Sequence, residues 1–296
     1  MTVTTQVKKQ PAKQNKKNSL KKDQEQEFIL KQSNYYSAEA NQHFMSKSLY
    51  WNFLGCEAAA LAQLKGEYNA FQDETPLLVG NYLHSYFESE ESHKSFLDVN
   101  KKKLYKYGKP EKGLKKQFTD ADKMIKALKD DPSFPYIYKG NKEAIVTGKI
   151  NGIQWMGKID CLNLDAKNSY FVDLKTVDDF HKKHWDDGQH KFVNFAQQRG
   201  YILQMAIYKE LIKQTFGINA RPFIIAVSKQ STPDKAIYSI PDEDMQEQLN
   251  ELQECQEHIR DVIKGTVKPI PCGHCDYCRM HKTLGSIQSI DDIEIF

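Results

Sequence analysis

The hydrophobic period of the chain changes between residues 143 and 176, and this change constrains the fold more than any other feature. Glu143 begins the segment EAIVTGKI, Asn151 and Gly152 follow, and IQWMGKIDCLNL runs to residue 164. Alternating apolar residues around an Asn-Gly pair predict two antiparallel strands joined by a tight turn. The turn segment DAKN leads into a third strand, SYFVDLKT. We therefore expect a three-stranded meander at the centre of the chain.

Helical patterns lie on both sides of these strands. We expect helices at about 46–65 and 77–88 before the strands and at about 194–216 after them. Further strands are expected at PFIIAVS and AIYSI, followed by a polar helix at about 242–264. This order of elements predicts an α/β domain with a central mixed β-sheet flanked by helices.

Charged residues interrupt the second and third strands of the meander. Asp173 and Lys175 are two positions apart in an apolar strand, so both side chains project from one face of the sheet. Asp160 interrupts the preceding strand in the same way, and the short turn makes the two strands neighbours. Asp165 and Lys167 have the same spacing but lie in the turn, where a polar pair needs no functional explanation. Asp160, Asp173 and Lys175 are thus expected to converge.

Converging carboxylates repel each other unless a cation lies between them. Hard oxygen ligands with incomplete protein coordination suit Mg²⁺ or Mn²⁺, which retain waters and bind substrate phosphate. This arrangement is typical of phosphodiester cleavage. The alternative is a cross-strand ion pair between Lys175 and an aspartate at a sheet edge, with no catalytic role.

The two ends of the chain differ in composition from its centre. Of 296 residues, the first 22 carry seven lysines and no acid. Residues 1–33 are predicted to be a disordered basic tail, which could also hold nucleic acid, and residues 283–296 an acidic C-terminal tail. No apolar run reaches the length of a membrane span, and the N-terminus lacks an apolar signal core, so we expect a cytoplasmic protein with no membrane partner.

A second basic stretch lies inside the chain. Residues 101–129 contain eleven lysines and three acids, interleaved with aromatic residues. Cations beside aromatic rings suit a nucleic-acid backbone and its bases, whereas an exposed face kept soluble by charge is the alternative. The predicted DNA-binding residues are Lys101, Lys102, Lys103, Tyr105, Lys115 and Lys116.

Six cysteines occur in a chain without a secretory signal, so a disulfide framework is not expected. Cys161 and Cys255 are interpreted as buried thiols. Cys272, Cys275 and Cys278 form a C-x2-C-x2-C run, a spacing that brings three thiolates onto one small loop, as an iron–sulfur cluster requires. With His281 the run also forms a Cys₃His zinc set. Iron–sulfur, zinc and unliganded thiols all remain open.

Several of these motifs together resemble the PD-(D/E)XK nucleases. Asp160, Asp173 and Lys175 match the signature of the superfamily, LLVGNYLHSYFES resembles the helix that bears a metal-binding histidine in its RecB-type branch, here His84, and QMAIY matches its Q-x-x-x-Y motif. These segments, together with NYYSAEANQHFMSKSLYWNFLGCEAAALAQLKGE and CGHCDYC, resemble phage and prophage exonucleases similar to RecE, exodeoxyribonuclease VIII, over residues 34–282.

The resemblance implies a Mg²⁺-dependent exonuclease that degrades one strand of linear duplex DNA from 5′ to 3′. The resulting 3′ tail would serve a RecT-like single-strand annealing protein, and relatives form rings around DNA. The resemblance to phage and prophage proteins also implies the cytosol of a bacterial host. Two alternatives are a RecB-type nuclease with another role, such as an endonuclease or a CRISPR-adaptation nuclease, and a non-catalytic DNA-binding metal-cluster protein.

The resemblance also implies roles for individual residues. Metal ligands would be His84, Asp160, Asp173 and the Leu174 backbone carbonyl, with Glu143 as a further candidate through a metal-bound water. Lys175 would orient or deprotonate the attacking water, and Gln204 and Tyr208 would position DNA or brace Lys175; alternatively, His84 is a core histidine and Gln204 and Tyr208 only pack on the sheet. Cys56 resembles the lone N-terminal cysteine that completes a [4Fe-4S] site in cluster-bearing relatives.

Overall fold

The structure is a computed structural model that describes residues 28–69, 73–165, 167–186, 190–198, 200–285, 287 and 289–292. Its centre is a five-stranded sheet with the strand order β1-β2-β3-β6-β7. Strands β3 and β6 are parallel, and the other neighbouring pairs are antiparallel. The predicted mixed sheet is therefore confirmed. The strands are β1 (Asn141–Ile150), β2 (Ile153–Asn163), β3 (Tyr170–Val177), β6 (Arg221–Ser228) and β7 (Lys235–Ser239).

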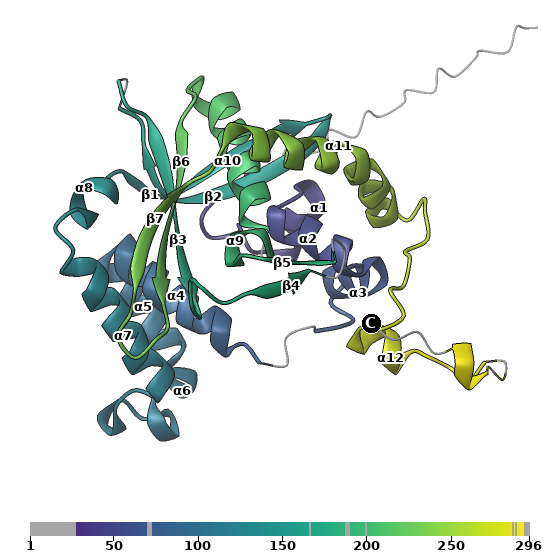
Figure 1. Cartoon of the computed structure of the whole chain (residues 1–296), viewed down its shortest axis with the longest axis horizontal. Coiled ribbons are helices and arrows are strands. Elements are labelled where there is room, and N and C mark those ends of the chain that lie inside the picture. Colours follow the sequence, from purple (N-terminus) through teal and green to yellow (C-terminus); the bar gives the residue numbers. More distant parts are fainter. Residues whose placement is uncertain are drawn as a thin grey trace, which may run out of the picture.

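Helices cover both faces of the sheet and form two separate hydrophobic cores. Figure 1 shows α4 (Thr75–Glu88), α5 (Glu90–Val99) and α7 (Lys116–Lys129) on one side. Their apolar residues pack against Val172 and Leu174 of β3. On the other side lie α2 (Lys47–Gly55), α3 (Glu57–Leu64), α10 (Tyr201–Phe216) and α11 (Asp242–Lys264), which pack around Trp155 and Phe171. Burial on both sheet faces is the main source of stability of such a layered domain.

The predicted hairpin between the first two strands is confirmed. Ile150 pairs with Ile153, and the two residues between them, Asn151 and Gly152, have φ values of 48° and 78°. Two consecutive positive φ values define the turn that matches the twist of a two-residue hairpin, and Asn-Gly is the pair that adopts it most easily. This turn fixes the register of β1 against β2.

Two helices predicted as continuous are interrupted. The 46–65 helix breaks at Cys56, whose extended backbone (φ −166°, ψ 110°) ends α2 and begins α3. The 194–216 helix is divided into α9 (Phe195–Gln198) and α10. Gly200, before α10, has a φ of 61°, and a Cβ atom at this position would lie 2.4 Å from the Trp51 ring. The close approach of Trp51 therefore requires glycine and stops the helix there.

The N-terminal part of the described chain packs along the β1–β2 hairpin. Met45 forms backbone hydrogen bonds with both neighbours of Trp155, donating to the Gln154 carbonyl and accepting from the Met156 N–H. Phe28 stacks on His43 at 4.8 Å, so packing against the domain begins before residue 34, where we expected the domain to start. Residues 1–27 of the predicted basic tail lie outside the described residues.

Short elements complete the described fold, and they are not predicted from the sequence. They are α1 (Ala38–His43), α6 (Lys101–Leu104), η1 (Lys106–Gly108), η2 (Pro110–Lys112), α8 (Phe134–Ile137), β4 (His184–Asp186), β5 (Lys191–Val193), α12 (Asp276–Met280) and η3 (Ile290–Asp292).

No helix among the described residues is long and apolar enough to cross a membrane.

Candidate nuclease site

The site lies where β2 and β3 separate. The two strands pair only from Cys161 to Asn163, and the pairing stops at the level of Asp160 and Asp173. Asp160 takes over the next ladder position, because its Oδ2 accepts a hydrogen bond of 2.7 Å from the Leu174 N–H. Both aspartates are buried. The divergence of the strands thus brings two carboxylates into the interior without leaving the Leu174 donor unsatisfied.

Strand β1 is distorted beside the same point. Glu143 has a φ of 51°, although residues 142 and 144 on either side of it pair regularly with β2. A positive φ is uncommon for a residue with a side chain and is found preferentially at functional sites. The Glu143 side chain is buried, and its Oε2 lies 2.6 Å from Lys158 Nζ. The distortion places a third carboxylate next to the two aspartates.

Three side chains from three elements form a possible metal site. His84 from the middle of α4, Glu143 and Asp160 each offer one ligand atom, and these atoms all lie within 4.8 Å of one another. His84 Nδ1 is 3.4 Å from Asp160 Oδ2. Two carboxylate oxygens and one imidazole nitrogen are suitable ligands for a divalent ion.

Asp173 and Lys175 lie on the face of β3 that is turned toward α10, as the strand period predicts. Gln204 Nε2 of α10 donates a hydrogen bond of 2.7 Å to Asp173 Oδ1. Lys175 Nζ lies 2.7 Å from Asp173 Oδ2 as an ion pair outside hydrogen-bonding angles, and 4.6 Å above the Tyr201 ring. Tyr208, one helical turn after Gln204, packs against Gly157, where a Cβ atom would lie 2.8 Å from its ring. Gln204 therefore orients a carboxylate, and the Tyr208 hydroxyl lies beside Gln204 while its ring packs on β2. The predicted roles of both residues in positioning DNA or bracing Lys175 stay predictions.

Burial and like charges shift the pKa values of these groups. Burial and the neighbouring Asp173 raise the pKa of Asp160 to about 8, despite the opposing effects of Lys175 and the Leu174 N–H. Burial and Asp160 also raise the pKa of Glu143, whereas burial and Lys175 lower the pKa of His84. Burial alone would lower the pKa of Lys175, but Asp173 reverses the shift and keeps the ammonium charged. The site therefore contains repelling carboxylates and a neutral imidazole, an environment that favours a bound cation.

Comparisons with known proteins agree with this geometry. The model of a family described as "PDDEXK-like domain of unknown function (DUF3799)" matches residues 46–281. The chain belongs to this PDDEXK-like family. A crystal structure of a protein named "Putative exonuclease" from Eubacterium rectale is 32% identical, with a TM-score of 0.79 over 90% of this chain and 98% of that one.

Other comparisons add little to the family assignment. The crystal structure of SSO0001 is 14% identical over 79% of this chain and 93% of that one, with a TM-score of 0.29, too low to bear on function. A search of curated protein sequences found no match. The family match and the Eubacterium rectale structure show a PD-(D/E)XK nuclease fold and support a nuclease.

The PDDEXK-like chain brings most of the predicted site residues together. His84, Asp160, Asp173, Lys175 and Gln204 meet around the split between β2 and β3. The Glu143 carboxylate lies within 4.8 Å of the ligand atoms of His84 and Asp160, and its role as a metal ligand, direct or through a water, stays a prediction. The Leu174 N–H is bound by Asp160, and the metal-binding role of the Leu174 carbonyl stays a prediction.

Lys158 and Tyr201 are the site residues that the sequence analysis missed. Lys158 lies on β2 two residues before Asp160 and pairs with Glu143, and Tyr201 forms the aromatic surface beneath Lys175. The alternation of β2 could have indicated Lys158, since it shares the parity of Asp160. No comparable signal marks Tyr201, because its place depends on the break at Gly200.

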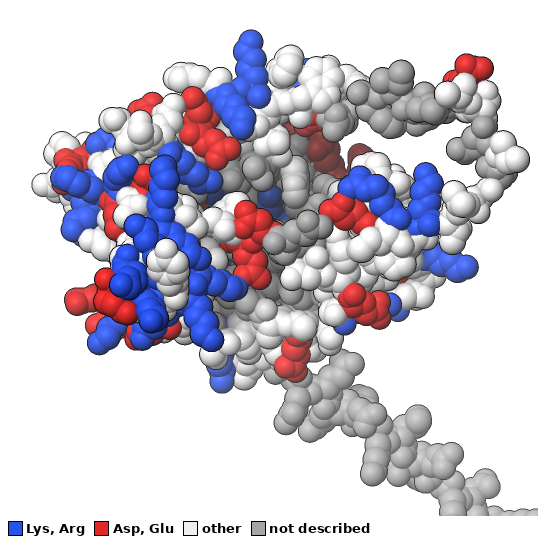
Figure 2. Space-filling model, turned by 90° about the horizontal axis from the view of Figure 1, so that it is seen from below, with Lys and Arg blue, Asp and Glu red and all other residues white. Residues whose placement is uncertain are grey.

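The basic stretch forms a compact projection. Figure 2 shows Lys and Arg side chains gathered on the face that carries α6 at the lower edge of Figure 1. A cavity of about 310 Å³ there is lined by Lys102, Lys103 and Lys115 together with residues of α4. Three of the predicted lysines have acidic partners: Lys101 pairs with Asp98, Lys103 with Glu74 and Lys116 with Asp120.

The two tyrosines of this projection differ in exposure, and the DNA-binding role of Tyr105 stays a prediction. Tyr105 is partly buried against the core formed by α4 and α7, and its backbone bridges to Leu114. Tyr107 is 87% exposed and has a φ of 56°. Tyr105 therefore supports the projection, and Tyr107 is the ring available for contact with a partner.

Four cysteines from distant parts of the chain meet at the C-terminal end. Cys56, Cys272, Cys275 and Cys278 offer sulfur atoms that all lie within 4.8 Å of one another. Backbone N–H groups donate to three of these sulfurs, an arrangement that stabilises thiolates. Without a metal ion, burial raises the pKa of Cys56 and Cys275, whereas the N–H groups of His274 and Cys275 outweigh burial and lower the pKa of Cys272. The cluster is thus suited to bind metal.

The predictions for Cys161, Cys255 and His281 have different outcomes. Cys161 is buried as expected, with Lys142 Nζ at 3.2 Å from its sulfur. Cys255 is exposed, so the prediction of a buried thiol there is wrong. His281 lies outside the cysteine group, with its Nδ1 2.7 Å from the Tyr277 carbonyl and its ring against Tyr277.

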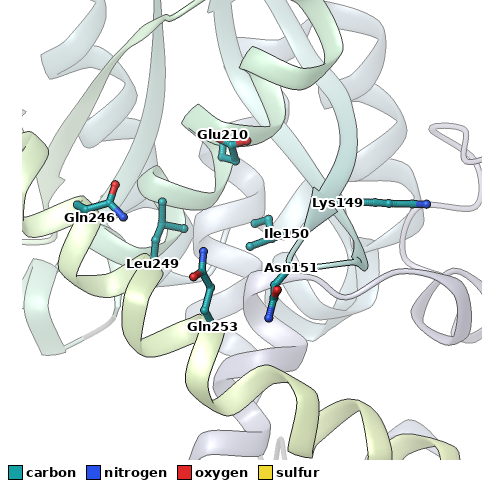
Figure 3. Close-up of a pocket in the computed structure, with 7 residues that line it drawn as sticks. All are labelled: Lys149, Ile150, Asn151, Glu210, Gln246, Leu249 and Gln253. Carbon is teal, nitrogen blue, oxygen red and sulfur yellow. The ribbon is translucent and has the colours of Figure 1, made fainter.

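A separate cavity of about 260 Å³ lies between the β1–β2 turn, α10 and α11 (Figure 3). Its lining includes Lys149, Asn151 and Glu210, and it shares no residue with the carboxylate cluster. We assign it no part in the chemistry.

Proposed function

We propose that this chain is an exodeoxyribonuclease that requires a divalent metal ion and degrades one strand of linear double-stranded DNA from 5′ to 3′. The observation that carries the proposal is the meeting of His84, Glu143 and Asp160 beside the Asp173–Lys175 pair at the split between two strands. The 32% identical protein from Eubacterium rectale is named as an exonuclease, which supports the exonucleolytic mode of cleavage.

The metal ion in this proposal is Mg²⁺ or Mn²⁺. The buried, mutually repelling carboxylates and the neutral His84 fit such an ion, and Asp173 and the Leu174 carbonyl are further proposed ligands. Bound there, the ion would polarise the scissile phosphate and lower the pKa of an attacking water.

The chain's own groups would orient the reactants. Lys175 keeps its positive charge beside Asp173, so it can hold the attacking water by hydrogen bonding and stabilise negative charge that develops on the phosphate. Gln204 fixes the orientation of the Asp173 carboxylate through its 2.7 Å hydrogen bond. The lysines of the basic projection would bind the phosphate backbone of the duplex.

The product and its use belong to the same proposal. Degradation from the 5′ end leaves a 3′ single-stranded tail, which is the substrate of a single-strand annealing protein of the RecT-like kind. A homo-oligomeric ring around DNA would keep the enzyme on its substrate. Sedimentation of the purified chain with and without DNA measures the oligomeric state, and a monomer in both conditions would exclude the ring.

The test uses linear duplexes labelled at either the 5′ or the 3′ end, together with closed circular DNA, in Mg²⁺ or EDTA. We expect degradation of linear duplex only with Mg²⁺, early release of the 5′ label, and intact circles. Cutting of closed circles would indicate an endonuclease, and early release of the 3′ label would reverse the polarity.

A matched pair of variants links the activity to the site. Lys175→Ala removes the half-buried lysine of β3, whereas Lys167→Ala removes the exposed lysine of the turn, which has the same acid-x-lysine spacing. We expect Lys175→Ala to lose at least about a hundredfold in rate and Lys167→Ala to match the wild type. Equal rates in the two variants would contradict the proposed mechanism, and a wild type inactive on every substrate would favour a non-catalytic DNA-binding protein.

A further inference from the structure

The four-cysteine cluster is too compact for the iron–sulfur cluster that cluster-bearing relatives contain. The Cys56 and Cys278 sulfurs are 3.6 Å apart, the Cys272 and Cys278 sulfurs are 3.9 Å apart, and no pair in the group exceeds 4.8 Å. The distances between the four sulfurs limit the size of the inorganic centre that they can bind.

Simple geometry separates the two kinds of centre. In a tetrahedral zinc site with Zn–S bonds of about 2.3 Å, the sulfurs are separated by about 3.8 Å. In a [4Fe-4S] cube each thiolate extends outward from its own iron corner, so neighbouring cysteine sulfurs are about 6 Å apart. The distances in this chain match the first value and fall well short of the second.

The positions of the side chains also indicate whether Cys56 or His281 is the fourth ligand. Cys56 is within the group, because the break between α2 and α3 gives it an extended backbone that begins a new helix. His281 is outside the group and its ring packs on Tyr277. Four thiolates in tetrahedral arrangement are typical of zinc.

We propose that Cys56, Cys272, Cys275 and Cys278 bind a single structural Zn²⁺ ion in a Cys₄ site, and that His281 is not a ligand. The proposal does not rest on the nuclease activity, because it concerns metal content alone. In such a site the four thiolates would fill all coordination positions of the zinc ion, which would have no redox role.

The cysteine site joins the C-terminal segment to the start of α3. Neighbouring side chains also hold these two parts of the chain together. Glu57, next to Cys56, has one carboxylate oxygen 2.9 Å from His258 Nε2 and accepts from the Ile270 N–H at 2.8 Å with the other. Tyr68 packs edge-on against Tyr277 at 5.1 Å. A metal ion that closes the long loop between residues 56 and 272 would stabilise this end of the domain.

The experiment is metal analysis of the full chain, purified without oxygen from cells supplied with both iron and zinc. We expect about one zinc per chain, no acid-labile sulfide, and a colourless protein. Replacement of zinc by Co²⁺ should give the visible absorption of a tetrahedral thiolate site. About four irons with sulfide, one iron, or no metal would each overturn the proposal.

Variants test the ligand set. Cys56→Ser and Cys272→Ser should each lower the zinc content at least about fivefold, whereas Cys255→Ser, which changes the exposed thiol, and His281→Ala should keep one zinc. Circular dichroism confirms folding, and if Cys56→Ser fails to fold, loss of the cobalt thiolate absorption in Cys272→Ser serves in its place. Zinc loss in His281→Ala, or full retention in Cys272→Ser, would contradict the assignment.

Discussion

Asp160 makes two kinds of interaction that a single substitution can separate. Its Oδ2 accepts from the Leu174 N–H, and its charge faces His84, Glu143 and Asp173. Asp160→Asn keeps an acceptor for Leu174 but removes the charge. We expect cleavage to fall at least about a hundredfold and Mg²⁺ no longer to raise Tm, because the metal loses a carboxylate ligand. Nuclease assays and thermal melts measure both effects. Asp165→Asn, in the exposed turn, is the control, and a metal-stabilised Asp160→Asn protein would contradict the assignment.

The raised pKa of Asp160 makes the stability of the metal-free protein depend on pH. The pKa is about 8 in the folded chain and about 3.9 in an unfolded one, so the folded state binds more protons between these values. The contribution of Asp160 to stability is therefore fully present below about pH 3.9 and is lost as the pH rises from there to about 8. Glu143 acts in the same direction, and His84, whose pKa is lowered, acts in the opposite direction only near and below its unfolded value of about 6.5.

The informative window is thus about pH 6.5 to 8, above the unfolded pKa of histidine and up to the folded pKa of Asp160. In EDTA we expect Tm to fall across this window, and the increase of Tm by Mg²⁺ to grow, because the ion must displace the proton from Asp160. Asp160→Asn should reduce both trends. The same pH dependence of Tm in the wild type and in Asp160→Asn would show that the carboxylate is already ionised in the folded protein.

At the scale of residues, the sequence indicates Asp160, Asp173 and Lys175 but leaves Glu143 uncertain. The reason is physical: strand period predicts which face a side chain occupies only while the strand is regular. Glu143 reaches the metal group through a φ of 51°, and nothing in the local sequence predicts that distortion.

At the scale of elements, the position of α10 depends on one close contact. Gly200 precedes this helix with a φ of 61° and the Trp51 ring against it, whereas Gly217 ends the helix with a φ of 69° and open space around it. We expect Gly200→Ala to lower the free energy of unfolding by more than about 2 kcal/mol through strain and steric clash, and Gly217→Ala by only about 1 kcal/mol through strain alone. Urea unfolding of both variants measures the difference.

Gly200→Ala should also reduce activity in the fraction that remains folded, since α10 carries Gln204 and Tyr201 toward the β3 residues. Equal stability of the two glycine variants would show that Trp51 can move aside. We predicted one helix because apolar residues lie on both sides of residues 197–200, and the contact between Gly200 and Trp51 is a tertiary one that the sequence does not show.

The basic projection can be tested by its effect on binding. Lys102 and Lys115 line the same cavity, and among the ion pairs of the described residues neither has an acidic partner. We expect Lys102→Glu and Lys115→Glu to weaken duplex binding in EDTA and to reduce the salt dependence by about one unit of slope for each lysine that contacts a phosphate. Lys268→Glu, an exposed lysine of the C-terminal segment, is the control. An unchanged salt slope would leave the projection as a solubilising surface.

At the scale of the whole molecule, the two sides of the sheet contribute different residues to the candidate site. The face covered by α4, α5 and α7 contributes His84, and the opposite face contributes Asp173, Lys175 and Gln204, so the split between β2 and β3 is where the two sides meet. The order of helices and strands predicted the layers, and the meander predicted that β1, β2 and β3 are neighbours. The parallel pairing of β3 with β6 and the point where β2 and β3 diverge could not be predicted, because they depend on contacts that the local sequence pattern does not show.

The proposed magnesium site and the proposed zinc site should lose their ions independently of each other. Mg²⁺ would be held by a few carboxylates and waters and exchange readily, whereas zinc in four thiolates would be retained. We expect EDTA to abolish cleavage at once, with full recovery on adding Mg²⁺ and little change in zinc content. A mercurial thiol reagent applied to the Cys255→Ser protein should release zinc and lower Tm by several degrees, even with Mg²⁺ present. Zinc release by a colorimetric indicator, followed alongside Tm and cleavage, separates the two sites. Loss of Tm in step with Mg²⁺ removal alone would show that the nuclease site, and not the cysteine site, holds the ends of the domain together.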